Sequence, residues 1–438
     1  MEKILGVRGM NDLLPEKLRI WRVVENKIIS VFKSYGIEEI RTPILERTEL
    51  FLRGLGEATD IVEKEMYSFQ DQLNDQFLSL RPESTAPVVR SVVQHSLAYN
   101  EPRKLWYYGP MFRHERPQAG RFRQFHQFGV EMFGYEGFEC EAELILICGA
   151  IWAEVGLASK KTPVLKINSI GTKEERSLYI DSLRNYLKKH EDSLNDDDLR
   201  RLNINPLRIL DSKDKSIEKI VCEAPKINSF LGQKSLSHFN GLLDFINANN
   251  IPFNVDLSLV RGLDYYNSVV FEWVIEEKQS QNTVCGGGRY DALVGHLGGK
   301  ISSACGFALG MERLIDLIEH QQEESFDEGL DLYVAHDGEA MRLLSMGFSE
   351  KLREAGLNVR VDITSASIKS QIKRANRNRA SFVAIFNLEE AKQNCVSIKS
   401  IGYESQSSRP SSVQKTMPIE QLADFLLIEK SKRRKKMI

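Results

Sequence analysis

Near the start of the chain, apolar residues recur at the spacing of an amphipathic helix. Between residues 21 and 35, one helical face carries Val24, Ile28, Val31 and Phe32. Gly36 follows as a helix stop. Residues 37–45 then predict a short strand that contains Pro43. Because proline cannot donate a hydrogen bond to a neighbouring strand, we expect this strand to be bent or to lie at a sheet edge.

A pattern with a period of two predicts a pair of strands between residues 105 and 135. The strands flank a polar loop, residues 116–121, whose proline and glycine favour a turn. In the returning strand one face carries Phe125, Gln127, Gly129 and Glu131. The other face carries His126, Phe128, Val130 and Met132. We expect the second, mostly apolar face to pack on a core, and the first to form the floor of a polar pocket.

The pattern changes in the middle of the chain. Residues 172–250 read as helices joined by acidic and polar links, which is typical of a helical insertion into a larger domain. Strand-like sequence resumes after the insertion, and we expect a turn at Gly286, Gly287 and Gly288. The segment that follows predicts a glycine-containing strand leading directly into a helix that begins near Arg313.

The last hundred residues predict a separate domain. The polar segment 321–329 reads as a linker. Strands and helices then alternate, which predicts a small α/β domain with a loop at residues 401–416. The basic run 430–436 reads as a disordered, solvated tail. The fold class we expect is α+β, organised as a main domain in two parts (1–171 and 253–322), a helical insertion (172–252), an α/β domain (330–428) and a basic tail (429–438).

Composition narrows the class of protein. The chain has 438 residues, of which 42% are hydrophobic and 27% charged, with a net charge of −2. An anionic partner must therefore be bound by local basic patches. The six cysteines form no Cys-x-x-Cys pair, which gives zinc and redox motifs no support and suits a reducing compartment. The sequence has no signal peptide and no stretch near the ~18 apolar residues of a membrane span, so we expect a cytoplasmic protein.

Three segments of the main domain carry an arginine in a setting suited to phosphate: Arg113, Arg261 and Arg313. Arginine is always charged and its planar fork matches phosphate oxygens. A single arginine more often forms a surface or interface ion pair, so only the joint placement of the three favours a triphosphate site. The chain has no GxxxxGK[ST] loop, so a nucleotide would be held differently from the way P-loop enzymes hold it.

The segment 81–86 places a carboxylate and hydroxyls directly after an apolar strand. Glu83 with Thr85 forms a good site for a cationic amine. The competing reading is structural, because Ser84 or Thr85 can cap the helix that follows, with Glu83 at its start. The two readings are compatible.

Together these segments resemble the three signature motifs of class II aminoacyl-tRNA synthetases. The first is the helix and strand ending at Pro43, the second is the strand pair around Phe112-Arg113-His114-Glu115, and the third is residues 306–313 (GFALGMER). Two more segments, residues 259–266 (LVRGLDYY) and 284–291 (VCGGGRYD), are similar to the histidine-specific motifs of the histidyl-tRNA synthetase family. Ser84 departs from the family's usual glycine, and the basic run at the end has no counterpart in the family pattern.

The resemblance implies an enzyme that uses ATP and Mg²⁺ to activate L-histidine and then joins it to tRNA(His). It implies that Arg113 and Arg261 act as catalytic residues at the α-phosphate of ATP, with Arg261 serving where other class II enzymes use a metal. It places Arg313 and Arg121 at the outer phosphates and Glu115 at the adenine. The residues that ligate Mg²⁺ stay open.

For histidine, the resemblance assigns Glu83, Thr85 and Gln127 to the α-amino group, and Glu131, Tyr265 and Tyr266 to the imidazole. The alternation described above already places Gln127 and Glu131 on one face. No editing site is expected, since a polar pocket left unpaired rejects other amino acids.

For RNA, the resemblance points to the loop 116–123 at the acceptor end and to the last domain at the anticodon. There Lys369, Lys373 and Arg377 share one helix face, although a solvated face is the commoner reading of such a run. Through its first motif, the resemblance also implies a homodimer.

Three alternatives remain. A regulatory paralogue of histidine biosynthesis shares the class II domain, but usually lacks the anticodon-binding domain and loses motif arginines, which this chain keeps. A pure RNA-binding or signalling module would not need an uninterrupted histidine pocket. Another class II synthetase would need residues 259–266 to match by chance.

Overall fold

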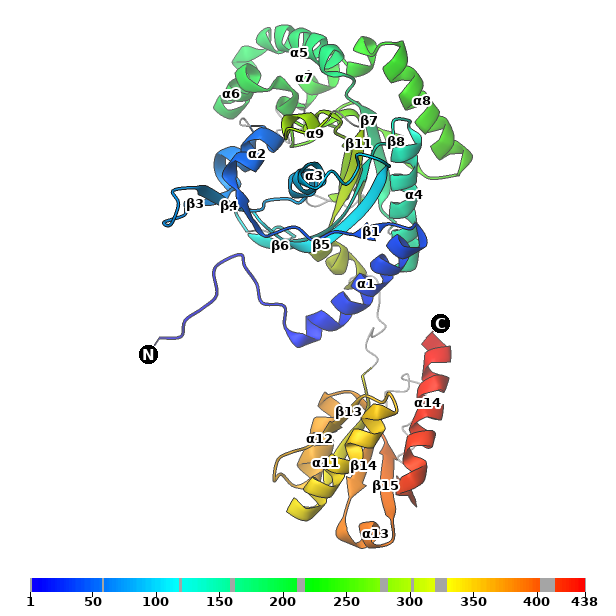
Figure 1. Cartoon of the computed structure of the whole chain (residues 1–438). Helices are drawn as coiled ribbons and strands as arrows, with labels where there is room; N and C mark the ends of the chain where they lie inside the picture. Colours follow the sequence, from blue (N-terminus) through cyan, green and yellow to red (C-terminus); the bar gives the residue numbers. More distant parts are fainter. Residues whose placement is uncertain are drawn as a thin grey trace. The chain divides into compact units, whose positions relative to one another are not determined.

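The computed structural model divides into two compact units, Met1–Ser325 and Phe326–Ile438, shown in Figure 1. It describes every residue except 1, 57–58, 118–119, 158–161, 211–216, 276–282, 301–302, 320–328, 402–413 and 438. The linker predicted at 321–329 and most of the loop predicted at 401–416 therefore lie outside the described residues. In the part of the chain that is described, no helix has the length and apolar character needed to cross a bilayer.

The first predicted helix is present and begins earlier than the apolar pattern indicates. Helix α1 spans Pro15–Ser34, with proline in its first turn and Glu16 beside it, a start signal that the apolar spacing alone does not contain. Gly36 follows with φ +65°, a backbone conformation that glycine adopts without strain. Strand β1 (Glu38–Glu39) then pairs with β5 at the edge of the main sheet, which confirms the edge position. The predicted strand 37–45 is too long, because residues 40–44 are not strand and Leu45 begins a strand of another sheet.

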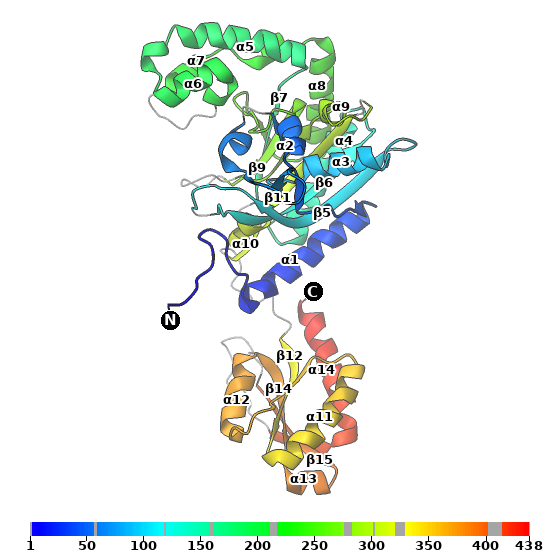
Figure 2. The ribbon, with the colours of Figure 1, turned by 60° about the vertical axis from the view of Figure 1, so that its left-hand side comes forward.

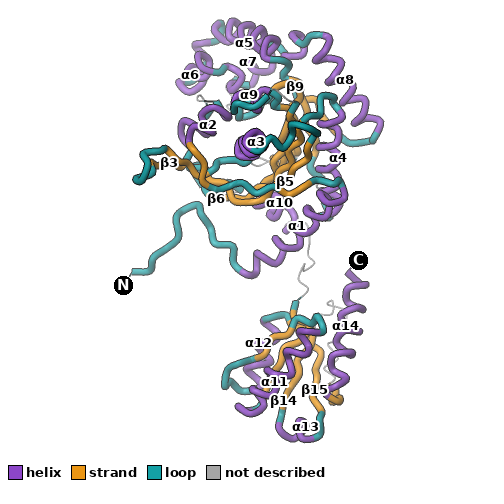
Figure 3. The backbone as a smooth tube through the Cα atoms, in the orientation of Figure 1, coloured by secondary structure: helices purple, strands orange, loops and turns teal. Residues whose placement is uncertain are grey.

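An eight-stranded sheet forms the centre of the larger unit, in the order β1-β5-β6-β11-β10-β9-β7-β8. All neighbours are antiparallel except β1 with β5 and β7 with β8. The further strands are β5 (Arg103–Phe112), β6 (Gln124–Phe133), β7 (Val164–Ser169), β8 (Phe253–Val255), β9 (Asn267–Val274), β10 (Thr283–Arg289) and β11 (Ala304–Gly310). The sheet with helices on its faces is visible in Figure 3 and confirms the α+β class.

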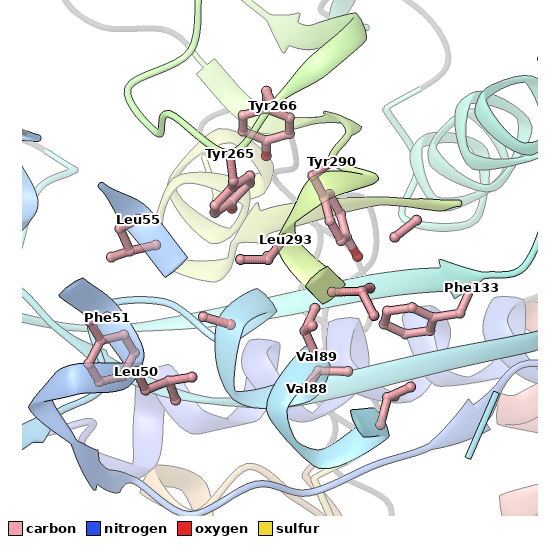
Figure 4. Close-up of a cluster of buried hydrophobic side chains, with 14 of the residues drawn as sticks. Leu50, Phe51, Leu55, Val88, Val89, Phe133, Tyr265, Tyr266, Tyr290 and Leu293 are labelled. Atoms are coloured by element: carbon pink, nitrogen blue, oxygen red, sulfur yellow. The ribbon is translucent and has the colours of Figure 1, made fainter. Parts of the chain in front are cut away.

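The two faces of β6 pack as the alternation predicts. On one face, Phe128 contacts Phe32 of α1, Met132 contacts Cys140 of α4 (Glu139–Glu154), and His126 contacts Glu312 of α10 (Met311–Glu319). The opposite face is covered by α2 (Thr48–Leu55), α3 (Thr85–Gln94) and α9 (Ala292–His296). Figure 4 shows Val88 and Val89 of α3 in the apolar cluster that these helices form with the sheet.

A small three-stranded sheet lies beside α2 and α3. Its order is β2 (Leu45–Arg47), β4 (Phe77–Leu80), β3 (Tyr67–Gln70), and the five-residue helix η1 (Ile61–Glu65) precedes β3. Strand β4 leads directly into the segment 81–86 and so to the start of α3.

The glycine run at 286–288 is not a turn, and that prediction is wrong. Gly286, Gly287 and Gly288 lie inside β10, between β9 and β11. A Cβ added to Gly287 would lie 2.2 Å from the backbone oxygen of Gly306. Glycine is therefore required here because the backbones of neighbouring strands approach closely. A run of glycines in the sequence is compatible with either a turn or such a strand, so the sequence alone did not distinguish them.

We expect Gly287→Ala to lower the free energy of unfolding by about 1–3 kcal/mol, because the new methyl group meets backbone that cannot move aside cheaply. Gly149→Ala in α4 is the matched control, since a Cβ there meets nothing within 4 Å. The control should be neutral or stabilising by up to about 1 kcal/mol, as for glycine to alanine in a helix. Urea unfolding of both variants measures this, and equal midpoints would contradict the close-approach account.

The segment between β7 and β8 is helical, as predicted. It contains α5 (Lys173–Lys188), α6 (Asp196–Ile204), α7 (Glu218–Glu223) and α8 (Gln233–Ala248), with 3-10 turns between them. Thr172 and Glu175 form a capping box that starts α5. The helices enclose their own apolar cluster, which includes Tyr179, Leu183 and Leu187. Figure 2 shows these helices standing at one side of the sheet.

The smaller unit has the alternating pattern predicted from residue 330 onward. Its sheet runs β13-β12-β14-β15-β16, with β12 parallel to both β13 and β14. The strands are β12 (Leu330–His336), β13 (Val359–Val361), β14 (Ala380–Phe386), β15 (Cys395–Ser400) and β16 (Gln414–Pro418). The helices are α11 (Gly338–Glu354), α12 (Ile368–Arg377), α13 (Leu388–Lys392) and α14 (Leu422–Met437).

The basic run near the end is not a disordered tail, and that prediction is wrong for the residues whose side chains are described. Helix α14 continues through the run to Met437. Lys430 and Arg433 pair with the two carboxylate oxygens of Asp331, at 2.8 and 2.9 Å. Asp331 is almost completely buried, so these cations offset the cost of burying its charge.

Candidate active site

The sheet face beneath α3 has glycine and alanine residues between its polar side chains. In register across it, Glu131 of β6 lies opposite Gly306 of β11, and Gly306 lies opposite Gly288 of β10. The next row on this face runs Glu272, Gly286, Ala308, Gly129 and Tyr107. Because paired residues in neighbouring strands share a face, small residues gather between the polar ones. Polar side chains can therefore lie flat against the backbone of this face.

The glycines of this face are adjacent to the functional side chains. A Cβ at Gly306 would lie 1.8 Å from Glu131 Oε2, and one at Gly286 would lie 2.5 Å from the guanidinium of Arg261. A Cβ at Gly129 would overlap the ring of Tyr107. The glycines thus make room for the polar groups.

Glu131 is the most strongly perturbed acid of the face. It has no solvent exposure. Its Oε1 accepts a hydrogen bond from Thr85 Oγ1 at 2.6 Å, and its Oε2 accepts one from the Tyr290 hydroxyl. Burial raises the pKa of Glu131 to about 8, and the neighbouring Glu83 adds to the shift. Burial therefore favours the neutral carboxyl, and a ligand bringing an N–H donor or a positive charge would stabilise the ionised form.

Glu83 is a second buried carboxyl at the start of α3. Its oxygens accept the backbone N–H groups of Thr85 and Ala86 at 2.7 and 2.9 Å. Burial raises its pKa, although these hydrogen bonds oppose the shift. The helix is thus capped by Glu83, and the expectation that Ser84 or Thr85 supplies the cap is wrong. The Ser84 hydroxyl is buried without a hydrogen-bond partner in the described part of the chain.

Four tyrosines surround the two carboxyls. The ring centroids of Tyr265 and Tyr266 lie 4.6 Å apart, and that of Tyr290 lies 5.5 Å from Tyr265. Figure 4 shows these three rings together. Burial raises the pKa of Tyr266 to about 12, and it raises the pKa of Tyr107 further. The phenols are therefore neutral hydrogen-bond donors, and that of Tyr290 already donates to Glu131.

Two buried polar atoms on this face form no hydrogen bond with the described residues. Among the described residues, Tyr107 Oη and Gln127 Oε1 are buried without any hydrogen bond. Native proteins rarely leave such groups unpaired, because each costs free energy. Both side chains lie on the sheet face that carries Glu131, where a polar ligand would pair with them.

The predicted arginines form two linked groups beside this pocket. In the first, Arg113 donates from Nε to the Pro82 carbonyl at 2.9 Å, and its charge lowers the pKa of Glu83. Arg121 Nη1 lies 3.2 Å from Glu115 Oε2, and Arg113 Nη1 lies 4.0 Å from Glu115 Oε1. Glu115 thus holds Arg113 and Arg121 near each other.

The second group runs along the far side of this face. Arg261 forms an ion pair with Glu272, and its guanidinium lies 5.6 Å from the centre of the Tyr266 ring. Thr283 donates from Oγ1 to Glu272 at 2.8 Å, and its carbonyl accepts from Arg313 Nη1 at 2.5 Å. A continuous chain of contacts therefore joins Arg261 to Arg313.

Arg313 also connects the two groups. Burial lowers its pKa, and the positive charges of Arg121 and Arg113 lower it further. Its Nε donates to the Gly120 carbonyl at 3.2 Å, in the loop that carries Arg121. The structure therefore brings Arg113, Arg121 and Arg313 to one place, and links Arg261 to them through Thr283. Like charges collected in this way fit a polyanion.

Comparison with known proteins decides the family. Residues 9–314 match the histidyl-tRNA synthetase family, and residues 332–429 match an anticodon binding domain. The chain is 48% identical over 434 residues to a histidine–tRNA ligase of Burkholderia mallei, covering 98% of this chain and 96% of that one.

The chain belongs to the histidyl-tRNA synthetase family.

Solved structures agree with this assignment. The apo S. aureus histidyl-tRNA synthetase is 32% identical, with a TM-score of 0.78 over 97% of this chain and 100% of that one. A Bacillus halodurans protein described as an ATP phosphoribosyltransferase regulatory subunit/histidyl-tRNA synthetase is 23% identical, with a TM-score of 0.65 over 89% of this chain and 99% of that one. That second likeness concerns the fold alone.

Two residues of the site were not predicted from the sequence. Tyr290 donates to Glu131, and Glu272 pairs with Arg261. Tyr290 lies inside the histidyl-tRNA synthetase motif at 284–291 and was available there as a signal. Glu272 carried no such signal, since its role depends on the register of β9 against β10.

Proposed function

We propose that this chain activates histidine with ATP and transfers it to tRNA(His). The observation that carries the proposal is the adjacency of a buried pocket with two carboxyls, Glu83 and Glu131, to a cluster of four arginines. A pocket of this composition suits an amino acid with a cationic amine and an N–H-bearing ring. The arginine cluster suits the triphosphate of ATP.

Recognition of histidine follows from the charges of the pocket. The α-ammonium binds to Glu83, Thr85 and the unpaired amide oxygen of Gln127. The imidazole donates to Glu131, with Tyr265 and Tyr266 around it. An amino acid whose side chain has no N–H group leaves Glu131 buried and unpaired, which is costly.

The first step joins histidine to the α-phosphate. A carboxylate oxygen of histidine attacks the α-phosphorus, the bond from that phosphorus to the bridging oxygen breaks, and pyrophosphate leaves. Arg261 lies in the segment that leads into β9, and Arg113 directly follows β5. In this proposal both guanidinium groups bind the reacting phosphate and stabilise charge on its oxygens. Arg121 and Arg313 hold the outer phosphates, and Glu115 faces the adenine.

Magnesium enters this scheme with ATP. Among the described residues, no group of three or more His, Cys, Asp or Glu side chains could hold a metal ion. Glu115 and Glu272 are engaged by arginines. If Mg²⁺ binds with ATP, phosphate oxygens and water would be its main ligands, which suits an ion that dehydrates reluctantly, and it would offset negative charge on the phosphates.

In the second step a terminal ribose hydroxyl of tRNA attacks the histidyl carbonyl, and AMP leaves. The loop at 116–123, of which residues 118–119 lie outside the described part, carries basic side chains toward the acceptor end. In the smaller unit, Lys369, Lys373 and Arg377 are exposed along α12. This basic face supports binding of the anticodon stem.

A homodimer is part of the proposal. One face of the three-stranded sheet exposes the large apolar side chains of Leu45 and Phe69, at 40% and 48% of their full area. Such a patch beside α2 favours an interface with a second copy.

The alternative is a regulatory subunit without aminoacylation activity. The Bacillus halodurans structure shows that the fold by itself does not separate the two. Two features support the synthetase. The chain keeps Arg113, Arg261 and Arg313, which are joined by a chain of contacts, and it has the anticodon binding domain.

Aminoacylation of tRNA with each of the twenty amino acids in turn tests the proposal. We expect charging with histidine only, and ATP–pyrophosphate exchange that depends on histidine. Well-folded protein that binds histidine and shows neither activity would favour the regulatory subunit.

A further inference from the structure

The segment at 256–266 carries Arg261, Tyr265 and Tyr266 but has no regular secondary structure of its own. Strand pairing begins only at Asn267, the first residue of β9. The orientation of these three side chains must therefore depend on what the segment packs against. Several of its contacts come from the helical insertion.

Arg208, in the 3-10 turn Pro206–Ile209, holds the middle of this segment. Its Nη2 donates to the carbonyl oxygen of Gly262 at 2.8 Å, one residue after Arg261. Its Nη1 lies 3.0 Å from Asp60 Oδ2, just before η1. One guanidinium thus ties the Arg261 segment to the insertion on one side and to the larger unit's N-terminal part on the other.

Arg176, in the first turn of α5, holds the end of the same segment. Its Nη1 donates to the Tyr266 carbonyl at 2.5 Å. Burial lowers the pKa of Arg176, and Asp264 opposes that shift. The Arg176 guanidinium thus binds the backbone of Tyr266, and it interacts electrostatically with Asp264.

Asp264 lies between these contacts. The charges of Arg208 and Arg176 both act on it, each opposing the rise in its pKa that burial causes. On its other side the Asp264 N–H donates to the Leu55 carbonyl at 3.3 Å. A Cβ at Gly56 would lie 2.9 Å from Asp264 Oδ2. The segment is thus held between the insertion and the end of α2.

We propose that the insertion is a clamp on the segment 259–266, in which Arg208 and Arg176 are positioning residues for Arg261, Tyr265 and Tyr266. The inference rests on the proposed function, since these three residues matter only if adenylation occurs here. It assigns the insertion a role in the first chemical step, before any RNA is bound. An insertion that serves only to contact RNA would leave that step unaffected.

The test measures histidine-dependent ATP–pyrophosphate exchange without tRNA in Arg208→Ala and Arg176→Ala. Arg184→Ala is the matched control, because Arg184 lies on the same helix α5 and its contacts, to Asp181 and the Leu202 carbonyl, stay inside the insertion. We expect each clamp variant to lose about tenfold in kcat/KM, the size expected for one charge-assisted hydrogen bond that orients reacting groups. The control should stay within about twofold of wild type. Arg176→Lys should recover part of the loss, because lysine still reaches one carbonyl.

A second readout is hydrogen–deuterium exchange of the peptide covering residues 259–266. The clamp predicts faster uptake in this peptide for Arg208→Ala and Arg176→Ala, with β10 unchanged. The clamp would be overturned if all variants matched wild type in pyrophosphate exchange and in deuterium uptake. It would also be overturned if Arg184→Ala lost as much pyrophosphate-exchange activity as the clamp variants. If wild-type protein shows no pyrophosphate exchange, the proposed function fails, while deuterium uptake still decides whether the insertion holds the segment.

Discussion

Arg261→Ala is expected to lower histidine-dependent ATP–pyrophosphate exchange by about 10³-fold, the loss typical of removing a group that stabilises charge in the transition state. Binding of histidine alone should change by less than about threefold, because the proposed role of Arg261 is at the phosphate, and its guanidinium lies 5.6 Å from the centre of the Tyr266 ring. Stopped-flow or steady-state exchange, with equilibrium dialysis of histidine, separates the two effects.

The variant leaves Glu272 without its partner, so a control is needed. The double variant Arg261→Ala/Glu272→Gln removes the leftover negative charge, and it should remain as slow as the single variant if the guanidinium itself does the work. Arg261→Lys should be intermediate, since lysine keeps the charge and loses the fork. Near-normal exchange in Arg261→Ala would remove Arg261 from the mechanism.

Glu131→Gln is expected to lower kcat/KM for histidine by about 10²–10³-fold, because an amide cannot match a carboxylate as acceptor for the imidazole N–H. Glutamine keeps the shape of the side chain. Its amide oxygen can accept from one of the Thr85 and Tyr290 hydroxyls, and its NH2 group can donate to the other hydroxyl oxygen. The effect should therefore appear mainly in the KM for histidine, with the KM for ATP changed little. A KM for histidine within about twofold of wild type would mean that Glu131 does not read the ring.

The same substitution should change how stability depends on pH. Burial raises the pKa of Glu131 to about 8 in the folded protein, against an ordinary value of 4.5. The folded state therefore keeps a proton that the unfolded chain has lost, and wild-type stability falls as pH rises from about 4.5 to 8. Glu131→Gln has no carboxyl to titrate and lacks this loss. The difference in free energy of unfolding between the variant and wild type should therefore shift by about 3–5 kcal/mol in favour of the variant between pH 4 and pH 9. Urea unfolding at several pH values measures the difference, and parallel stability curves would contradict the buried acid.

Much of this fold was predictable from local patterns. The alternation along 124–133 separates the face with Gln127 and Glu131 from the face that packs on α1, because strand periodicity is a local property. The βαβ order of the smaller unit was equally readable. Arg113, Arg261 and Arg313 could be nominated from their residue type, but their convergence could not be read without the resemblance to a family.

What could not be predicted depends on long-range contacts. The glycines at 286–288 read as a turn, and only the pairing of β10 with β9 and β11 shows them as strand. The basic run at 430–436 read as a tail because its partner, Asp331, is about a hundred residues away. The contacts of Arg176 and Arg208 with the Arg261 segment likewise join residues far apart in sequence.

The most direct test of the account is a crystal structure with histidine and a non-hydrolysable ATP analogue. We expect the imidazole within hydrogen-bond distance of Glu131, the ammonium at Glu83, and the α-phosphate between Arg113 and Arg261, with the outer phosphates at Arg121 and Arg313. A nucleotide bound away from these arginines, or a histidine outside the Glu83–Glu131 pocket, would contradict it.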